Sequence, residues 1–208
     1  MGDLSVGARL NLLLEESKLA PLDTENAEKF EAYVSLILRW SAKMNLTAVR
    51  DEEGILSRHF LESIACARAL PEGIRTLLDY GSGAGFPGLP IALCRPEIAV
   101  TLAESQGKKA AFLQEALRVL RVRAKVEAQR AESLRTAFDC VTLRAVDRMR
   151  EAVEGAVSCV GGGGWLVLMT TSEDVNRLRT AAGSGFDWEE GVALPGGRNR
   201  LLALGRRR

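Results

Sequence analysis

The residues best suited to chemistry form a glycine-rich run between two apolar stretches. Residues 79–88 read Asp-Tyr-Gly-Ser-Gly-Ala-Gly-Phe-Pro-Gly and follow the apolar run at 74–78. Glycines at alternate positions, Gly81, Gly83 and Gly85, allow positive φ angles and let a ligand lie against the main chain. In an open α/β sheet, such a turn at the carboxyl end of a strand binds nucleotide-like ligands. The sequence therefore predicts a cofactor site at this turn.

Two cofactors fit a glycine-rich turn. Residues 83–88 match the GxGxxG pattern of dinucleotide sites, in which N–H groups at a helix N-terminus hold a pyrophosphate. Pro87 has no N–H to donate, Pro90 is expected to interrupt the helix that follows, and the Asp79 carboxylate would repel a pyrophosphate. That carboxylate suits S-adenosylmethionine, which carries an ammonium and a sulfonium group. Glu104, after a second apolar strand, would bind the ribose of either cofactor, so a nicotinamide-dependent oxidoreductase stays the alternative.

Composition excludes several classes of protein. The chain has 208 residues, 47% of them hydrophobic and 26% charged, which is ordinary for a globular protein. It has no apolar stretch of the ~18 residues that a membrane span needs, and its first residues lack the features of an export signal. The four cysteines form no CxxC pair, and the single histidine cannot complete a familiar zinc site. We expect a cytoplasmic protein without a metal, in which Cys140 is a core residue rather than a nucleophile.

Charge is unevenly distributed along the chain, although the net charge is only +1. Residues 104–150 contain eleven Lys and Arg against six Asp and Glu, and residues 195–208 contain five Arg and no acid. Residues 1–57 and 151–194 are acidic, with six basic against ten acidic and two against seven. Such asymmetry is typical of a protein that presents one face to phosphates, and ordinary solvated surface charge is the alternative.

The chain divides into a helical part and an alternating part. Apolar residues at helical spacing predict helices over 4–19, from 24 onward and over 53–70. From residue 76 onward, short apolar strands alternate with helical stretches. The predicted strands cover 76–79, 98–103, 124–128, 138–143 and 165–170, and the predicted helices 87–94, 107–120, 147–159 and 173–182. This rhythm predicts an α/β fold with a mostly parallel sheet and helices on both faces.

These elements suggest two structural parts. We expect residues 1–70 to form an N-terminal helical extension packed on a core of residues 71–208. Gly161 to Gly164 reads as a flexible turn before the fifth strand. The segments 191–194 and 201–204, on either side of Pro195-Gly196-Gly197, read as a terminal hairpin.

Several short motifs share their order and spacing with one known family. They are Asn45-Leu46-Thr47, Arg58-His59-Phe60-Leu61-Glu62-Ser63, the glycine turn, residues 101–109 around Glu104, Arg130-Ala131-Glu132 and Arg144-Ala145-Val146. Over about residues 40–170 the chain resembles the bacterial small-subunit ribosomal RNA guanine-N7 methyltransferases, the glucose-inhibited division protein B family. The resemblance implies a Rossmann-like class I S-adenosylmethionine-dependent methyltransferase core. It also implies methylation of N7 of one guanine in the 530 loop of 16S rRNA, by a protein that we expect to be a monomer.

The resemblance assigns cofactor roles residue by residue. Residues that should wrap the methionine and ribose portions are Gly81, Ser82, Gly83, Ala84, Gly85 and Phe86. Asp79 should reach the methionine ammonium, and Glu104, followed by Ser105, the ribose. Ala131 and Glu132 should lie near the adenine. Arg144, at the end of the fourth predicted strand, should lie beside the cofactor carboxylate and the target base.

Other residues are candidates for contacts with RNA. Taken alone, His59 reads as a structural helix histidine and Asn45 as a turn-capping residue. The resemblance moves both toward the RNA-facing cleft, where they join Arg144 as catalytic candidates. Basic residues that could contact phosphates without reading sequence are Lys108, Lys109, Arg130 and Arg198. The chain departs from the family in having no lysine after its fifth predicted strand.

The chemistry expected for guanine N7 asks little of the protein. N7 carries an in-plane lone pair and no proton, so no general base is needed and alignment should supply most of the catalysis. The substrate could be 16S rRNA or an assembling 30S particle. The alternatives are a methyltransferase with another acceptor, such as a protein or small molecule, and a non-catalytic RNA-binding protein.

Overall fold

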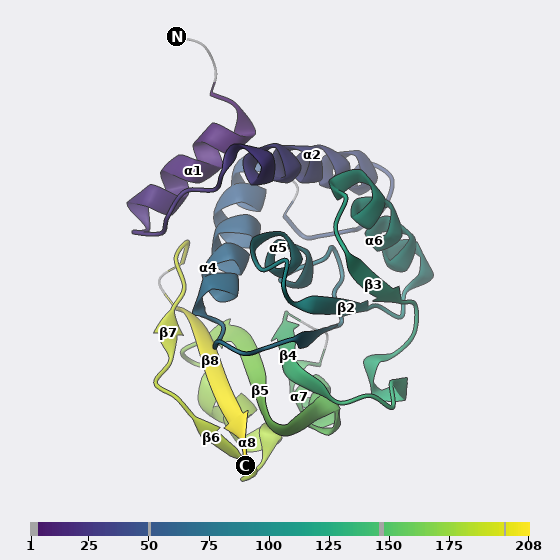
Figure 1. The fold of residues 1–208 in the computed structure, drawn as a ribbon, viewed down its shortest axis with the longest axis vertical. Helices are drawn as coiled ribbons and strands as arrows, with labels where there is room; N and C mark the ends of the chain where they lie inside the picture. The colour runs from purple at the N-terminus through teal and green to yellow at the C-terminus, as the bar shows by residue number, and fades with distance from the viewer. Residues whose placement is uncertain (1–3, 50, 146–147, 198) are drawn as a thin grey trace.

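A group of helices precedes the first strand. The computed structural model describes residues 4–49, 51–145, 148–197 and 199–208. The helices are α1 (Val6–Glu16), α2 (Thr24–Ser41), α3 (Glu52–Gly54), the π-helix η1 (Ile55–Phe60) and α4 (Leu61–Ala69). Figure 1 shows α1 and α2 at the top and α4 below them. Asp23 caps α2 by accepting a hydrogen bond from the Asn26 N–H at 2.7 Å. No helix among the described residues is long and apolar enough to cross a membrane.

The remaining chain builds one mixed sheet. Its strands are β1 (Thr76–Tyr80), β2 (Ala99–Ala103), β3 (Ala124–Glu127), β4 (Phe138–Arg144), β5 (Val160–Thr171), β6 (Phe186–Trp188), β7 (Val192–Ala193) and β8 (Arg200–Arg207). The order is β3-β2-β1-β4-β5-β8-β6, with β7 also paired to β8. The first five strands are mutually parallel, and β8 runs antiparallel beside β5. The predicted mostly parallel sheet and terminal hairpin are confirmed.

Helices cover both faces of the sheet, which gives two apolar cores. The helices after β1 are α5 (Gly88–Cys94), α6 (Gly107–Leu120), α7 (Met149–Ala156) and α8 (Val175–Ala182), with short 3₁₀ turns η2 (Ala131–Ser133) and η3 (Val157–Cys159). One core joins α5 and α6 to α1, α2 and α4 of the predicted extension, and the other joins α7 and α8 to the opposite face (Figure 1). The chain therefore packs its predicted N-terminal extension into the core that also supports β1 and β2.

Two local expectations were wrong. Pro90 does not interrupt α5, because it lies in the first turn of that helix, where a backbone N–H has no intrahelical partner. Gly161 to Gly164 belong to β5 rather than to a separate turn, and the pairing of β4 with β5 shifts register across them. The third predicted helix is confirmed, because α3, η1 and α4 follow one another without a break, although η1 has wider π-type turns.

Aromatic rings at the centre of the first core join the helices to the glycine turn. Phe60 of η1 lies between Phe30 and Tyr33 of α2, with ring centroids at 4.9 Å and 5.2 Å. Tyr33 in turn stacks on Phe86 of the turn at 5.5 Å. Phe30, Tyr33 and Phe60 are completely buried. This cluster holds η1 against the turn that was predicted to bind the cofactor.

We expect Phe60→Ala to lower the free energy of unfolding by about 3–5 kcal/mol, because it removes a ring from a packed core. Leu12→Ala is the control, since Leu12 is 47% exposed on α1 and such a surface change should stay within about 0.5 kcal/mol. Urea unfolding of the three proteins measures both effects. A loss below about 1 kcal/mol for Phe60→Ala would show that the cluster does not hold this region together.

Candidate active site

The glycine turn is fixed by hydrogen bonds on both sides. The Ser82 N–H donates to the Ala103 carbonyl of β2 at 3.0 Å, and the Tyr33 hydroxyl donates to the Ala84 carbonyl at 2.5 Å. Gly85, at φ +91°, has no room for a side chain, because a Cβ there would come within 2.5 Å of the Tyr33 hydroxyl. Gly83, at φ +57°, faces open space, and a Cβ would approach no atom closer than 3.9 Å. One glycine is therefore required by packing, and the other leaves room for a ligand.

Asp79 lies beneath this turn. Its carboxylate is 1% exposed and accepts hydrogen bonds from the Gly88 N–H at 3.1 Å and the Thr142 hydroxyl at 3.0 Å. Burial raises the pKa of Asp79 to about 6, against the opposing effect of these hydrogen bonds. The Gly88 N–H at the start of α5 is thus already bonded to a carboxylate. A pyrophosphate would need that N–H group, so the arrangement disfavours a dinucleotide.

Glu104 lies at the neighbouring strand end. Tyr80 pairs with Ala103, so β1 and β2 end at the same edge of the sheet. The Glu104 carboxylate accepts one hydrogen bond from the Gly83 N–H at 2.9 Å and another from the Gln106 N–H at 2.8 Å. It is therefore held directly beside the open side of Gly83, where the sequence predicted the ribose-binding acid.

The residues at this edge fit S-adenosylmethionine. The open space at Gly83 admits a ligand against the backbone, and the Glu104 carboxylate beside it suits ribose hydroxyls. The residues that would hold it are the turn 81–86 with Glu104. Asp79 is buried with both oxygens bonded, so its contact with the ammonium stays a prediction. Among the described residues, no group of three or more His, Cys, Asp and Glu side chains could hold a metal ion.

Arg144 and His59, both predicted site residues, meet at Phe86. The Arg144 guanidinium lies 5.7 Å from the centre of the Phe86 ring, and the His59 ring stacks on Phe86 at 4.6 Å. Arg144 donates hydrogen bonds to the Arg58 carbonyl at 2.5 Å and to Glu62 at 2.9 Å. Its Nε atom is buried without a partner among the described residues. The structure thus brings a cation and an imidazole to the last side chain of the glycine turn.

His59 is held as a neutral ring. Burial, together with the positive charges of Arg144, Arg58 and Arg200, lowers the pKa of His59 to about 3. Nε2 lies 2.8 Å from the Thr47 hydroxyl oxygen, which also accepts a hydrogen bond from the Val49 N–H. His59 belongs to η1, and π-type turns are frequent at functional sites.

Asn45 lies on the loop that the hydrogen bond between Thr47 and His59 holds in place. The loop follows α2, and Asn45 is exposed two residues before Thr47. Thr47 is the residue that binds His59, so the loop is fixed against η1 at this point. The loop that carries Asn45 is thereby joined to η1, and the catalytic role of Asn45 stays a prediction.

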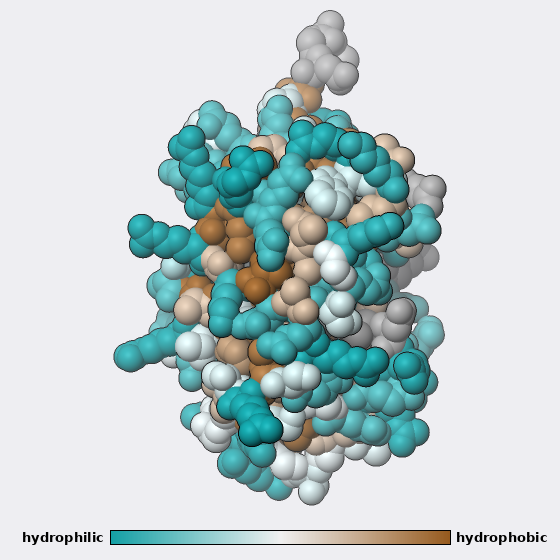
Figure 2. Space-filling view, turned by 90° about the vertical axis from the view of Figure 1, so that its right-hand side faces the viewer, coloured by the Kyte–Doolittle hydropathy of each residue, from teal (hydrophilic) through white to brown (hydrophobic). Residues whose placement is uncertain are grey.

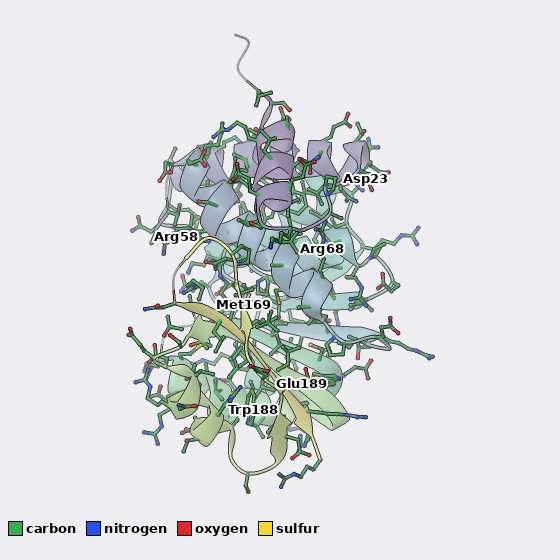
Figure 3. The ribbon with its side chains drawn as sticks, turned by 90° about the vertical axis from the view of Figure 1, so that its left-hand side faces the viewer. Asp23, Arg58, Arg68, Met169, Trp188 and Glu189 are labelled. Atoms are coloured by element: carbon green, nitrogen blue, oxygen red, sulfur yellow. The ribbon has the colours of Figure 1, made fainter. Side chains whose placement is uncertain are left out.

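Glu62 and Arg200 complete the cluster. The Glu62 carboxylate is buried, and it pairs with Arg144 at 2.9 Å and with Arg200 of β8 at 3.1 Å. The turn before β8 lies against η1, since a Cβ on Gly196 would come within 2.5 Å of the Ser57 carbonyl oxygen. Figure 3 shows this yellow turn crossing in front of the helix near Arg58, with Met169 of β5 below it.

Sequence reasoning missed three residues of this arrangement. Tyr33 has a usable signal, because it lies three residues after Phe30 on the apolar stripe of α2 and a buried tyrosine hydroxyl needs a partner. Glu62 has a weaker one, since it follows His59 by three residues on a helical segment. Arg200 has none, because its contact with Glu62 spans 138 residues of chain.

The remaining predicted residues lie apart from this cluster. Ala131 is buried in η2 with Tyr80 in the second core, while Glu132, Arg130 and Ser105 are exposed. Lys108 is exposed and Lys109 half-buried in the first turn of α6. Within the described chain, no hydrogen bond or ion pair joins these residues to Arg144 or His59. Arg198 and Val146 lie outside the described residues.

We expect Asp79→Asn to change the pH dependence of stability. Since the pKa of Asp79 is raised from 3.8 to about 6, the native protein holds a proton that the unfolded chain has lost. Stability is therefore lost as the pH rises from about 4 to 6, by roughly 3 kcal/mol. The stability of Asp79→Asn relative to the wild type should rise by that amount across this range.

Urea unfolding between pH 4 and 7 measures this difference. The lowered pKa of His59 has the opposite effect, since its contribution is present above pH 6.5 and is lost as the pH falls. His59 is present in both proteins, so its contribution cancels in the difference. A difference that stays constant with pH would contradict the burial of an ionisable Asp79.

The fold recurs in solved methyltransferases of low sequence identity. A methyltransferase from Pyrococcus furiosus superposes with a TM-score of 0.62 at 11% identity, over 86% of this chain and 98% of that one. The M. jannaschii protein TYW2, solved in complex with AdoMet, superposes with a TM-score of 0.56 at 13% identity, over 73% and 75%. These likenesses show the class I methyltransferase fold.

Sequence comparison gives the family. A protein from Roseiflexus sp. (strain RS-1) named ribosomal RNA small subunit methyltransferase G is 40% identical over 197 residues, which cover 88% of this chain and 84% of that protein. A protein of the same name from Xanthomonas oryzae pv. oryzae (strain KACC10331 / KXO85) is 40% identical over 81% of each chain. The family model described as rRNA small subunit methyltransferase G matches residues 26–184. That match includes the glycine turn, Glu104 and Arg144, and we conclude that this chain belongs to the rRNA small subunit methyltransferase G family.

Proposed function

We propose that this enzyme transfers the methyl group of S-adenosylmethionine to N7 of a guanine in the 530 loop of 16S rRNA. The observation that carries the proposal is the meeting of Arg144 and His59 at Phe86, within a chain of this family. Phe86 is part of the predicted cofactor turn, and none of the alternative functions predicts a cation and an imidazole at this place. A nicotinamide-dependent oxidoreductase finds no support, because the Gly88 N–H is already bonded to Asp79.

The mechanism needs no proton transfer from the protein. When bound, S-adenosylmethionine supplies an electrophilic methyl group on a sulfonium. Guanine N7 attacks with a lone pair that carries no proton, so the neutral His59 has no proton to remove. His59 instead offers a flat ring, stacked on Phe86, that can fix the plane of the incoming base. Catalysis then comes mainly from alignment of the reacting atoms.

Arg144 is suited to orient both reactants. Its unpartnered Nε–H can donate to the cofactor carboxylate or to guanine O6, while Nη2 stays bonded to both Glu62 and the Arg58 carbonyl. Positive charge moves from sulfur to the base during the reaction, and the carboxylates of Asp79 and Glu104 lie at the same edge of the sheet. Such fixed charges stabilise the transition state without reorganisation.

The substrate is proposed to be 16S rRNA, either free or in a 30S particle. The net charge of the chain is only +1, so RNA must be bound by a local basic surface. Lys108 and Arg130 are exposed and Lys109 is half-buried, and these residues are proposed to belong to that surface. Phosphate contacts there would position the strand while the cluster at Phe86 receives the guanine.

Labelled methyl transfer tests the proposed function. 30S particles and rRNA from a strain without the endogenous enzyme are incubated with labelled S-adenosylmethionine, and the modified nucleoside is identified. We expect label in 7-methylguanosine within the 530 loop, and none with Arg144→Ala. Label in another nucleoside, or only in protein or a small molecule, would move the function to another acceptor.

We expect kcat to be independent of pH from about 7 to 9. The pKa of His59 is about 3, so this ring does not titrate in that range, and N7 needs no base. Activity should fall below about pH 6, where Asp79 takes up a proton. His59→Gln should lower kcat by roughly 10-fold, well short of the 10²–10⁴-fold of a general base, and keep the shape of the profile. A limb near pH 6.5 that disappears in His59→Gln would contradict the mechanism.

A further inference from the structure

A cleft separate from the cluster at Phe86 lies between the end of α2 and the start of α6. It has a volume of about 480 Å³ and is lined by Arg39, Trp40, Lys43, Met44, Lys108 and Glu115. This volume is in the range of small-ligand sites. Figure 2 shows the side of the molecule that carries α6 and β3, where hydrophilic residues dominate and apolar residues are visible between them.

The cleft has an excess of positive charge. The carboxylate of Glu115 is already bonded on both oxygens, to Arg39 at 2.9 Å and to the indole N–H of Trp40 at 2.9 Å. Lys43 and Lys108 are exposed, and neither makes an ion pair with any other described residue. Two ammonium groups therefore face the cleft without a counter-ion from the protein.

The position of Lys108 is unfavourable for the helix itself. Lys108 and Lys109 lie in the first turn of α6, which contains no acidic residue. The N-terminus of a helix carries a partial positive charge, so cations there are destabilising. An anion between Lys43 and Lys108 would remove this repulsion, which favours a phosphate as ligand over a neutral molecule.

The other wall of the cleft is apolar. Trp40 and Met44 are half-buried, and the Trp40 ring packs edge-on against the buried Phe112 at 5.7 Å. A rigid indole beside unpaired ammonium groups is the combination by which proteins bind single-stranded nucleic acid, stacking the base and neutralising the phosphate. An acidic peptide would use the lysines but not the indole.

The cleft adjoins the active-site residues through the chain. Met44 immediately precedes Asn45, and Lys108 follows Glu104 by four residues. We take these two chain connections as the link along which an RNA strand bound at Phe86 would reach the cleft. We propose that the cleft binds one nucleotide flanking the target guanine, with its phosphate on Lys43 and Lys108 and its base against Trp40 and Met44. This inference rests on the proposed rRNA substrate.

The charged half of the site is tested with Lys43→Ala/Lys108→Ala. The control is Arg118→Ala/Arg123→Ala, which also removes two exposed cations, one of them near the other end of α6. Binding to a 16S rRNA fragment containing the 530 loop is measured over a range of salt concentrations, and binding of S-adenosylmethionine by calorimetry. We expect the first variant to bind RNA roughly 10-fold more weakly, with a salt slope reduced by about 0.7 for the one phosphate that both lysines contact. Its cofactor affinity should be unchanged, and the control should keep an RNA affinity close to that of the wild type.

The stacking half is tested with Trp40→Leu and Trp40→Phe. Trp40→Leu should weaken RNA binding by roughly 10-fold with an unchanged salt slope, because stacking is not ionic. Trp40→Phe should keep most of the affinity, although it loses the bond to Glu115. Thermal unfolding shows that each variant is folded, and a Trp40→Phe protein that binds RNA as weakly as Trp40→Leu would overturn the stacking role.

The outcomes separate this inference from the proposed function. If the wild type methylates the rRNA and Lys43→Ala/Lys108→Ala binds it no more weakly than the control, the nucleotide site is wrong and the proposed function stands. If the wild type neither binds nor methylates the rRNA, both are wrong. Selective loss of RNA affinity in the lysine variant, with cofactor affinity intact, supports the site.

Discussion

The buried carboxylate of Glu62 is the interaction on which the active site depends. It joins three parts of the chain that are distant in sequence: α4, the end of β4 through Arg144, and the start of β8 through Arg200. A buried carboxylate is costly unless it is paired, and removal of one partner of such a group costs about 3–5 kcal/mol. The two guanidiniums therefore have little freedom to move. Arg144 is held over Phe86 by this constraint and by the Arg58 carbonyl, before any ligand arrives.

The same elements supply both the core and the site. Tyr33 packs within the aromatic cluster with its ring and supports the glycine turn with its hydroxyl. Asp79 ties the turn to α5 and to β4 by two hydrogen bonds in a buried environment. Electrostatic interactions are stronger where water is excluded, so these groups can act on a bound ligand more strongly than surface charges could. Because the same residues pack the core and form the site, many substitutions at the site should also lower the free energy of unfolding.

Local patterns in the sequence predicted most of the fold and part of the site. The pattern of short apolar strands predicted the parallel sheet. Since parallel strands end at one edge, the ends of these strands predicted that Glu104 and Arg144 lie at the same edge of the sheet. Contacts between distant segments were not predictable. Tyr33 and Ala84 are separated by 51 residues, and Glu62 and Arg200 by 138. The expectation that Pro90 interrupts a helix was wrong because the first turn of a helix tolerates a missing N–H. The expectation of a separate turn at residues 161–164 was wrong because a strand with a register shift can use glycine as readily as a turn can.

The most direct test of the account is a double-mutant cycle on kcat with Glu62→Gln and Arg144→Lys. If Glu62 acts by positioning Arg144, Glu62→Gln should lower kcat by roughly 10- to 100-fold with little change in cofactor affinity. The double variant should then be no slower than Arg144→Lys alone, because coupled residues are not additive. Thermal unfolding confirms that each protein is folded during the assay. A folded Glu62→Gln enzyme with wild-type kcat, or effects that add in full, would contradict the claim that this buried carboxylate organises the site.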